Sequence, residues 1–147
     1  MPKQKSSLPR RVRSTNPVTI LKAVIRAIEE EPRRYNQSLV VERREEEDDG
    51  YCPRARDYWP SCGTVACVAG WTNLLTGASK DEQESLSRAE DVLGLTYDEG
   101  EQLFHESAAG PIRSTYPGDR GPTPRAHARA GIRHIKRFVK AKWGVNL

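Results

Sequence analysis

The sequence predicts an all-α fold: a single small domain of about five helices around a central apolar helix. The chain has 147 residues, which is the length of one domain. Several segments carry helix-start signals or apolar residues at helical spacing. Residues 64–76 have no charged side chain on any face, as expected of a helix buried on all sides. The helical domain is expected over residues 16–147, after a basic flexible arm at residues 1–15.

The first predicted helix begins after Asn16 and ends before Pro32. Asn16 is a favourable N-cap, and Pro17 fits the first helical position, where its missing N–H would have no intrahelical partner. The apolar residues recur at helical spacing: Val18, Leu21, Ile25 and Ile28. The short apolar run at residues 38–41 is not enough to predict a sheet. Residues 42–49 are all charged, so we expect a solvated loop or a frayed helix end there.

The central helix is predicted over residues 64–76, with Thr64 as its N-cap. We expect Trp71 in the core and Cys67 beside it as a small, inert core residue. The glycines of this segment permit a tight turn and close helix packing.

Two short helices follow, separated by the sequence Leu-Gly-Leu at residues 93–95. The first places its apolar residues on one face: Leu86, Ala89, Val92 and Leu93. The second begins with Thr96 and Glu99 at capping-box spacing and should bury Leu103 and Phe104. The turn resembles that of a helix-turn-helix. Three carboxylates in the second helix would repel DNA phosphates, however, so we interpret the pair as a packing corner.

The last predicted helix begins with Thr123 and Pro124 and ends at Gly144. Its apolar stripe consists of Ala128, Ile132, Ile135 and Val139, with Phe138 and Trp143 beside it. Residues 120–147 contain eight Lys or Arg and no acid. This combination predicts a basic amphipathic helix that packs one face on the core and presents the other to a partner.

The charges alternate in blocks along the chain, with two basic ends around two acidic middle sections. We expect the basic ends to contact nucleic acid or an acidic protein partner, within a larger assembly if a partner holds the N-terminal arm. The expected partner-binding residues are Arg10, Arg11, Arg13, Arg125, Arg129, Arg133, Lys136, Arg137 and Lys140. His127 and His134 lie seven residues apart and would add contacts at lower pH. Neutralisation of the basic ends by the chain's own acidic blocks is the competing interpretation.

An alternative function is a cysteine-dependent hydrolase or transferase. If Thr64 caps the central helix, Cys62 lies at the positive end of its dipole, which favours a thiolate nucleophile. The base would be His127 or His134. The surrounding sequence differs from the papain-type signature, because its second cysteine lies two residues further on.

Other functional classes have little support in the sequence. Cys52, Cys62 and Cys67 are ten and five positions apart, unlike the cysteine pairs of zinc sites, so we expect neither a metal nor a cofactor. The longest uncharged run, residues 61–79, is interrupted by polar residues and glycine, which excludes a membrane span of this segment. We therefore expect a cytoplasmic, non-enzymatic protein.

One motif carries a family resemblance. The sequence Cys-Gly-Thr-x-x-Cys-x-Ala-Gly-Trp at residues 62–71, with Tyr-Asn-Gln at 35–37 before it and Leu-Gly-Leu at 93–95 after it, is similar to small uncharacterised proteins of bacteria and their phages. The resemblance covers residues 17–107. It implies a shared fold and a bacterial or phage source, and it implies no activity.

Overall fold

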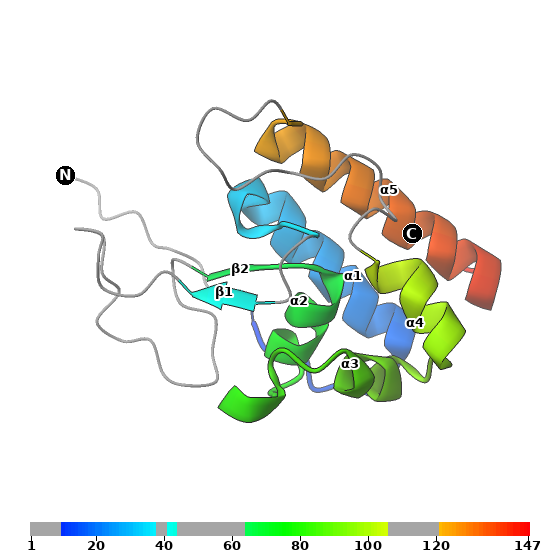
Figure 1. Ribbon diagram of the computed structural model, residues 1–147. Coiled ribbons are helices and arrows are strands. Elements are labelled where there is room, and N and C mark those ends of the chain that lie inside the picture. Colours follow the sequence, from blue (N-terminus) through cyan, green and yellow to red (C-terminus); the bar gives the residue numbers. More distant parts are fainter. Residues whose placement is uncertain (1–9, 38–40, 44–63, 106–120) are drawn as a thin grey trace.

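The computed structural model describes residues 10–37, 41–43, 64–105 and 121–147. Within this part the chain forms one small helical domain, which confirms the predicted all-α class (Figure 1). The helices are α1 (Pro17–Glu30), α2 (Val68–Leu75), α3 (Leu86–Leu93), α4 (Tyr97–Phe104) and α5 (Pro124–Trp143). Two single 3-10 turns, η1 (Pro32–Arg34) and η2 (Lys80–Glu82), and two three-residue strands, β1 (Val41–Arg43) and β2 (Thr64–Ala66), complete the described part.

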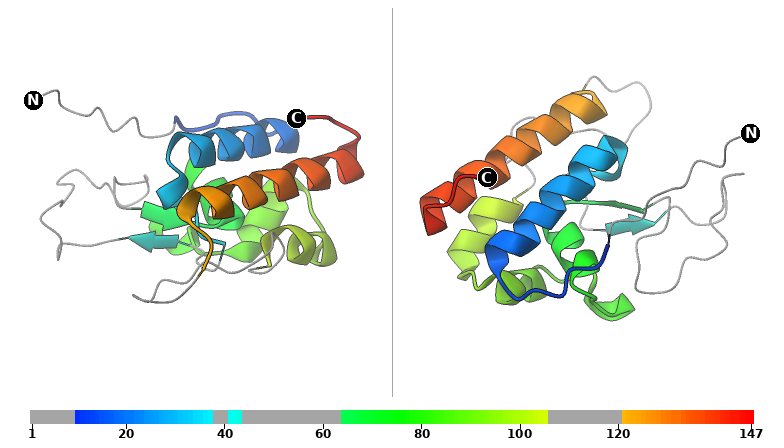
Figure 2. Two further views of the ribbon diagram at one scale, coloured as in Figure 1. Left: turned by 90° about the horizontal axis from the view of Figure 1, so that it is seen from above. Right: turned by 180° about the vertical axis from the view of Figure 1, so that it is seen from behind.

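Helix α2 lies at the centre of the domain. Every residue of α2 is buried, and α1 packs against it on one side while α3 and α4 pack on the other (Figure 1). Trp71 is fully buried, and its indole Nε1 donates a hydrogen bond to the carbonyl of Arg34, 3.0 Å away. Helix α5 lies beside α1, and the two run in opposite directions (Figure 2). The prediction of a central apolar helix with Trp71 in the core is therefore confirmed.

Helix ends coincide with the local signals in the sequence. The Asn16 side chain accepts hydrogen bonds from the first free N–H groups of α1, at 2.9 and 3.2 Å. Thr96 and Glu99 form the reciprocal capping box of α4. Thr123 caps the start of α5, and Gly144 ends it with φ of 68°, a left-handed conformation that suits glycine.

The start of the central helix differs from the prediction. Residues 64–66 form β2, which pairs antiparallel with β1, and α2 begins only at Val68 with Cys67 as its N-cap. Residues 42 and 43, expected in a loop or frayed helix end, belong to β1. Pairing between strands that are distant in the sequence leaves no local periodicity, so the sequence pattern did not reveal it.

Two apolar positions also differ from the prediction. Leu86 was expected on the buried face of α3, but it is 40% exposed, and Ala89 and Leu93 make the buried contacts of that helix. Ile132 is only partly buried, whereas the other members of the α5 stripe are buried. Leu86 is the first residue of α3, where the chain enters the helix from solvent.

A buried glutamine joins several elements of the core. Gln37 Oε1 accepts hydrogen bonds from the Tyr35 hydroxyl at 3.1 Å and from the backbone N–H of Val68 at 3.3 Å. Its Nε2 donates to the carbonyls of Leu103 and His105, each at 3.2 Å. Burial raises the pKa of Tyr35, so its hydroxyl remains a donor. This buried side chain therefore fixes the start of α2 and the end of α4 relative to η1.

Candidate functional site

The candidate site is the exposed side of α5, and its position is set by the buried side of the same helix. His127 is 2% exposed, and its ring stacks on Tyr35 with 4.8 Å between ring centroids. His127 Nε2 accepts a hydrogen bond from the backbone N–H of Gln37 at 3.1 Å. Ile135 and Val139 continue the buried side and are fully buried. These contacts fix the rotation of α5 about its own axis.

The burial of His127 corrects one expectation from the sequence. A ring enclosed by Tyr35 and Gln37 makes no contact with an outside partner. His127 therefore packs α5 on the core and does not lie on its partner-facing side. Its Nε2 accepts the hydrogen bond from Gln37 inside the core.

The opposite side of α5 carries a row of arginines. These side chains are all exposed and follow one another at intervals of four residues: Arg125, Arg129, Arg133 and Arg137. Four residues advance a helix by about 6 Å and turn it by about 40°, so the row spans about 18 Å and winds slowly along the exposed side. Exposed Lys140 and partly exposed Lys136 extend the row. We call these six residues the α5 basic row.

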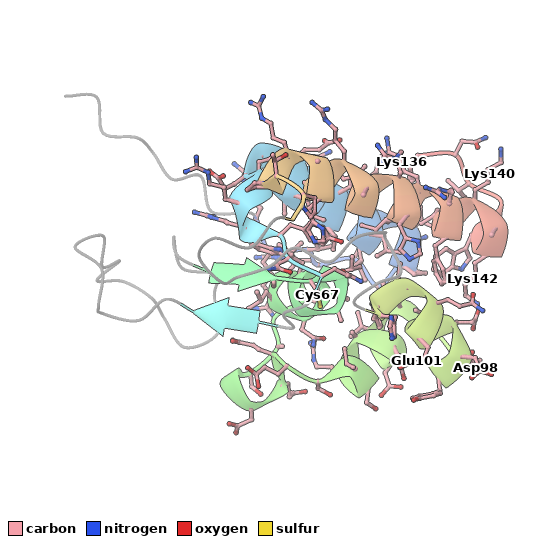
Figure 3. All side chains as sticks on the ribbon, turned by 45° about the horizontal axis from the view of Figure 1, so that its top comes forward. Cys67, Asp98, Glu101, Lys136, Lys140 and Lys142 are labelled. Atoms are coloured by element: carbon pink, nitrogen blue, oxygen red, sulfur yellow. The ribbon has the colours of Figure 1, made fainter. Side chains whose placement is uncertain are left out.

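Ion pairs within the chain do not neutralise the α5 basic row in the part that the structure describes. The recorded ion pair of α5 joins Lys142 to Glu99 of α4, and it holds the pKa of Glu99 below its usual value. Figure 3 shows Lys136 and Lys140 on the side of α5 away from α4. Asp98 and Glu101 lie on α4, on the other side of the molecule (Figure 3). Lys136 and Lys140 thus face away from these two carboxylates.

His134 lies between the two sides of α5. Its ring Nε2 donates a hydrogen bond to the carbonyl of Gln102 in α4, 2.9 Å away. Partial burial lowers the pKa of His134, and the nearby Arg137 lowers it further. A lowered pKa opposes the predicted gain of phosphate contacts by His134 in mildly acidic solution.

The N-terminal basic residues are described from residue 10 onward. The expectation of a free arm is corrected for residues 10–15, because the backbone N–H of Val12 donates to the carbonyl of Leu75 at 2.8 Å and its side chain packs on the core. Arg10, Arg11 and Arg13 are exposed on this segment. They do not extend the α5 basic row along the same helix; they line a separate cleft near its C-terminal end.

The cysteine alternative has no assembled site in the described part of the chain. Cys62 lies outside the described residues, and His127 is enclosed in the core. Cys67 occupies the N-cap position that favours a thiolate, and its Sγ accepts from the N–H of Gly70 at 3.5 Å. Burial nevertheless raises the pKa of Cys67 to about 11, so this thiol is protonated at neutral pH.

Neither the described residues nor the chain's similarity to known proteins assigns a further functional class. Among the described residues, no three metal-ligating side chains gather at one point. None of the described helices combines the length and the apolar character needed to cross a membrane. No protein-family model matches the chain, and no curated protein or solved structure matches it significantly.

The structure also brings together residues that the sequence did not connect. Arg88 and Asp91 of α3 and Trp143 of α5 line the same cleft as the N-terminal arginines. The only sequence signal was weak: Arg88 is the one basic residue between positions 81 and 112. A basic residue within an acidic segment does not show which distant segment of the chain it contacts.

Proposed function

We propose that this protein is a non-enzymatic binding protein that holds nucleic acid along the α5 basic row. The observation that carries the proposal is a row of four arginines at one-turn intervals with no carboxylate at ion-pair distance in the described part of the chain. Guanidinium groups remain charged at all relevant pH values and match phosphate oxygens in a bidentate geometry. The rigid packing of α5 would hold their backbone positions at fixed spacing, so that only the side chains need to be ordered on binding.

The dimensions of the row favour nucleic acid over an acidic protein. The four arginines of the row span about 18 Å, which corresponds to about five base-pair steps of a duplex, given a rise of about 3.4 Å per step. An evenly spaced row without any acid suits the regular charge of a phosphate backbone. It carries no side chains typical of base reading beyond the arginines, so we infer contact with phosphates independent of sequence. The proposal includes a cytoplasmic location and a place in a larger assembly.

The test is the salt dependence of binding to generic duplex DNA and to single-stranded DNA and RNA. If all six residues contact phosphates, the logarithm of affinity should fall with the logarithm of salt with a slope of about −5, an affinity loss of about 10³-fold between 50 and 200 mM salt. Fluorescence anisotropy on labelled oligonucleotides measures both quantities.

Two matched variants separate position from net charge. In the triple variant Arg129→Ala, Arg133→Ala, Arg137→Ala, the slope should flatten to about −3, since about three phosphate contacts are lost. The triple lysine variant at the same positions keeps the charge and should keep the slope while binding more weakly, because lysine lacks the bidentate fork. Absence of binding to all three nucleic acids at 50 mM salt would refute the proposal and leave an acidic protein as the partner.

A further inference from the structure

A cleft of about 1510 Å³ lies where the N-terminal segment passes the end of α3 and the last turn of α5. Figure 2 shows this segment, in dark blue, running past α3 before it enters α1. The walls of the cleft carry the side chains of Arg10, Arg11, Arg13, Arg88, Asp91 and Trp143, with aliphatic side chains of α1 and α3 between them. Its volume exceeds what most small-molecule ligands need.

The cleft concentrates positive charge. Four guanidinium groups line it against the single carboxylate of Asp91. Within the described residues, no hydrogen bond or ion pair is recorded for the side chains of Arg10, Arg11 and Arg13. Guanidinium groups cannot lose their charge in a protein, so their mutual repulsion in a concave site is relieved best by a bound anion.

Arg88 differs from the other three because its side chain is fixed by the protein. Its guanidinium donates to Asn73 Oδ1 at 3.1 Å and to Thr76 Oγ1 at 3.0 Å, and its Nε lies 3.4 Å from Glu82 Oε2. The guanidinium of Arg11 lies against Gly77, the residue after Thr76, so closely that a Cβ on Gly77 would overlap it. The cleft therefore has Arg88 fixed in its wall by hydrogen bonds and Arg11 packed on the backbone at Gly77, while Arg10 and Arg13 can turn toward a ligand.

Trp143 gives the cleft a flat aromatic wall, and Lys142 Nζ lies over the same ring, 5.6 Å from its centroid. It is the last residue of α5 and is partly exposed. Its ring packs edge-on against Phe138 with 5.9 Å between centroids, which restricts its orientation. An aromatic ring beside unpaired arginines is the combination that holds a base and its phosphate in single-stranded nucleic-acid sites.

We propose that this cleft binds one nucleotide unit, with its phosphate on Arg10, Arg11 and Arg13 and its base against Trp143. The proposal goes beyond the function proposed for the α5 basic row, because a single nucleotide is too short to follow that row. The shared chemistry is a phosphate ester attached to a flat ring. Its source is either a free mononucleotide or the terminal nucleotide of a strand.

Titration calorimetry of the full chain with AMP, adenosine and inorganic phosphate tests the proposal. We expect AMP to bind at least about tenfold more tightly than either fragment, since both the phosphate and the base contribute. Phosphate that binds as tightly as AMP would overturn the role of Trp143 and leave a simple anion site. No binding of AMP would overturn the proposal entirely.

Variants on each wall of the cleft give the second readout. Arg13→Gln and Trp143→Leu should each weaken AMP binding by about 5- to 100-fold, whereas Trp143→Phe should retain most of the affinity because it keeps a ring. Arg129→Gln is the matched control on the α5 basic row and should leave AMP binding unchanged. Equal AMP affinity in wild type and Arg13→Gln would refute the site, and melting temperatures show whether each variant is folded.

The two proposals can fail independently. The triple alanine variant of the α5 basic row should lose affinity for long duplexes and keep its affinity for AMP. A 5′-phosphorylated trinucleotide that binds more tightly than AMP and competes with it would identify a strand end as the source. Weaker binding of the trinucleotide than of AMP would identify the free nucleotide, and failure of the two ligands to compete would contradict a single nucleotide site.

Discussion

Substitution of Gly131 by alanine should destabilise the protein although Gly131 lies in the middle of a long helix. A Cβ at this position would overlap the hydroxyl of Tyr35 and lie 2.6 Å from its ring carbon Cε1. Tyr35 is fully buried, stacked on His127 and bonded to Gln37, so it cannot move aside without breaking these contacts. The absence of a side chain at Gly131 is therefore what lets α5 approach η1.

The expected change in the free energy of unfolding combines the cost of overpacking and of a lost hydrogen bond with the gain in helix propensity. Overpacking of a core costs about 1 to 3 kcal/mol, and loss of the hydrogen bond from the Tyr35 hydroxyl would add about 1 kcal/mol. Alanine regains about 1 kcal/mol of helix propensity relative to glycine. The net loss in the free energy of unfolding at Gly131→Ala should be about 2 kcal/mol, which lowers the melting temperature of a domain of this size by about 4 to 8 °C.

Gly100 in α4 provides the matched control. A Cβ there would overlap the side chain of Glu90 from its Cγ to its carboxylate. Glu90 is partly exposed on α3, and its side chain has no recorded hydrogen bond or ion pair within the described residues, so a change of rotamer can move it away. Gly100→Ala should therefore gain the helix propensity and raise the melting temperature by about 2 to 4 °C. The same substitution should thus have opposite signs at the two positions.

Thermal and urea unfolding followed by circular dichroism measure both variants. Tyr35→Phe removes the closest clashing atom, so the cost of Gly131→Ala should fall in that background, and a double-mutant cycle measures this coupling. A Gly131→Ala variant as stable as wild type would refute the packing argument, because no other large unfavourable term is available at this position.

Three further predictions concern the core and its titratable groups. Trp71→Ala should reduce the free energy of unfolding by about 3 to 5 kcal/mol, because the ring is fully buried in the centre of the domain; a loss below about 1 kcal/mol in urea unfolding would contradict this. Cys67 should resist iodoacetamide in the native protein at pH 7 and react once the chain is unfolded, because burial raises its pKa to about 11. Mass spectrometry of the Cys67 peptide measures the labelling, and stoichiometric labelling in the native state would show an accessible thiolate. The folded state binds a proton on His134 more weakly than the unfolded state does, so the stabilisation from neutral His134 should be present above pH 6.5 and be lost as the pH falls below that value. The melting temperature of His134→Gln should therefore decline less steeply with acid than that of wild type. An unchanged decline would exclude His134 as its source.

Helix ends were predictable from the sequence because their signals are local. Asn16, Thr96 and Thr123 cap helices through their own side chains, within one turn of the chain. The start of α2 was not predictable in this way. Residues 64–66 are apolar and β-branched enough for either state, and pairing with β1 decides between them. The N-cap of α2 is therefore Cys67 rather than the predicted Thr64. The helix-dipole argument for a Cys62 thiolate assumed Thr64 as the N-cap, so it no longer applies.

The candidate site shows the same division between local and distant information. The arginine row follows from the period of α5, so its members could be placed on one side of the helix from sequence alone. The burial of His127 could not be predicted from the sequence. The same helical spacing is found for a histidine exposed to solvent and for one packed on a residue such as Tyr35. The cleft could not be predicted either, since Arg13, Arg88 and Trp143 come from three separate segments.

Helix α5 connects the packing of the core to the geometry of the proposed interface. Its rotation is fixed by His127 and Gly131 against Tyr35, and the arginines of the basic row lie on the same rigid helix between and beyond these two residues. A change at Gly131 should displace α5 and alter stability and polyanion affinity together. A change at Arg133, which is exposed and has no recorded ion pair in the described part, should alter affinity and leave stability within about 0.5 kcal/mol of wild type. Because the two kinds of variant differ in this way, a loss of binding can be assigned to the contact surface or to the framework that holds it.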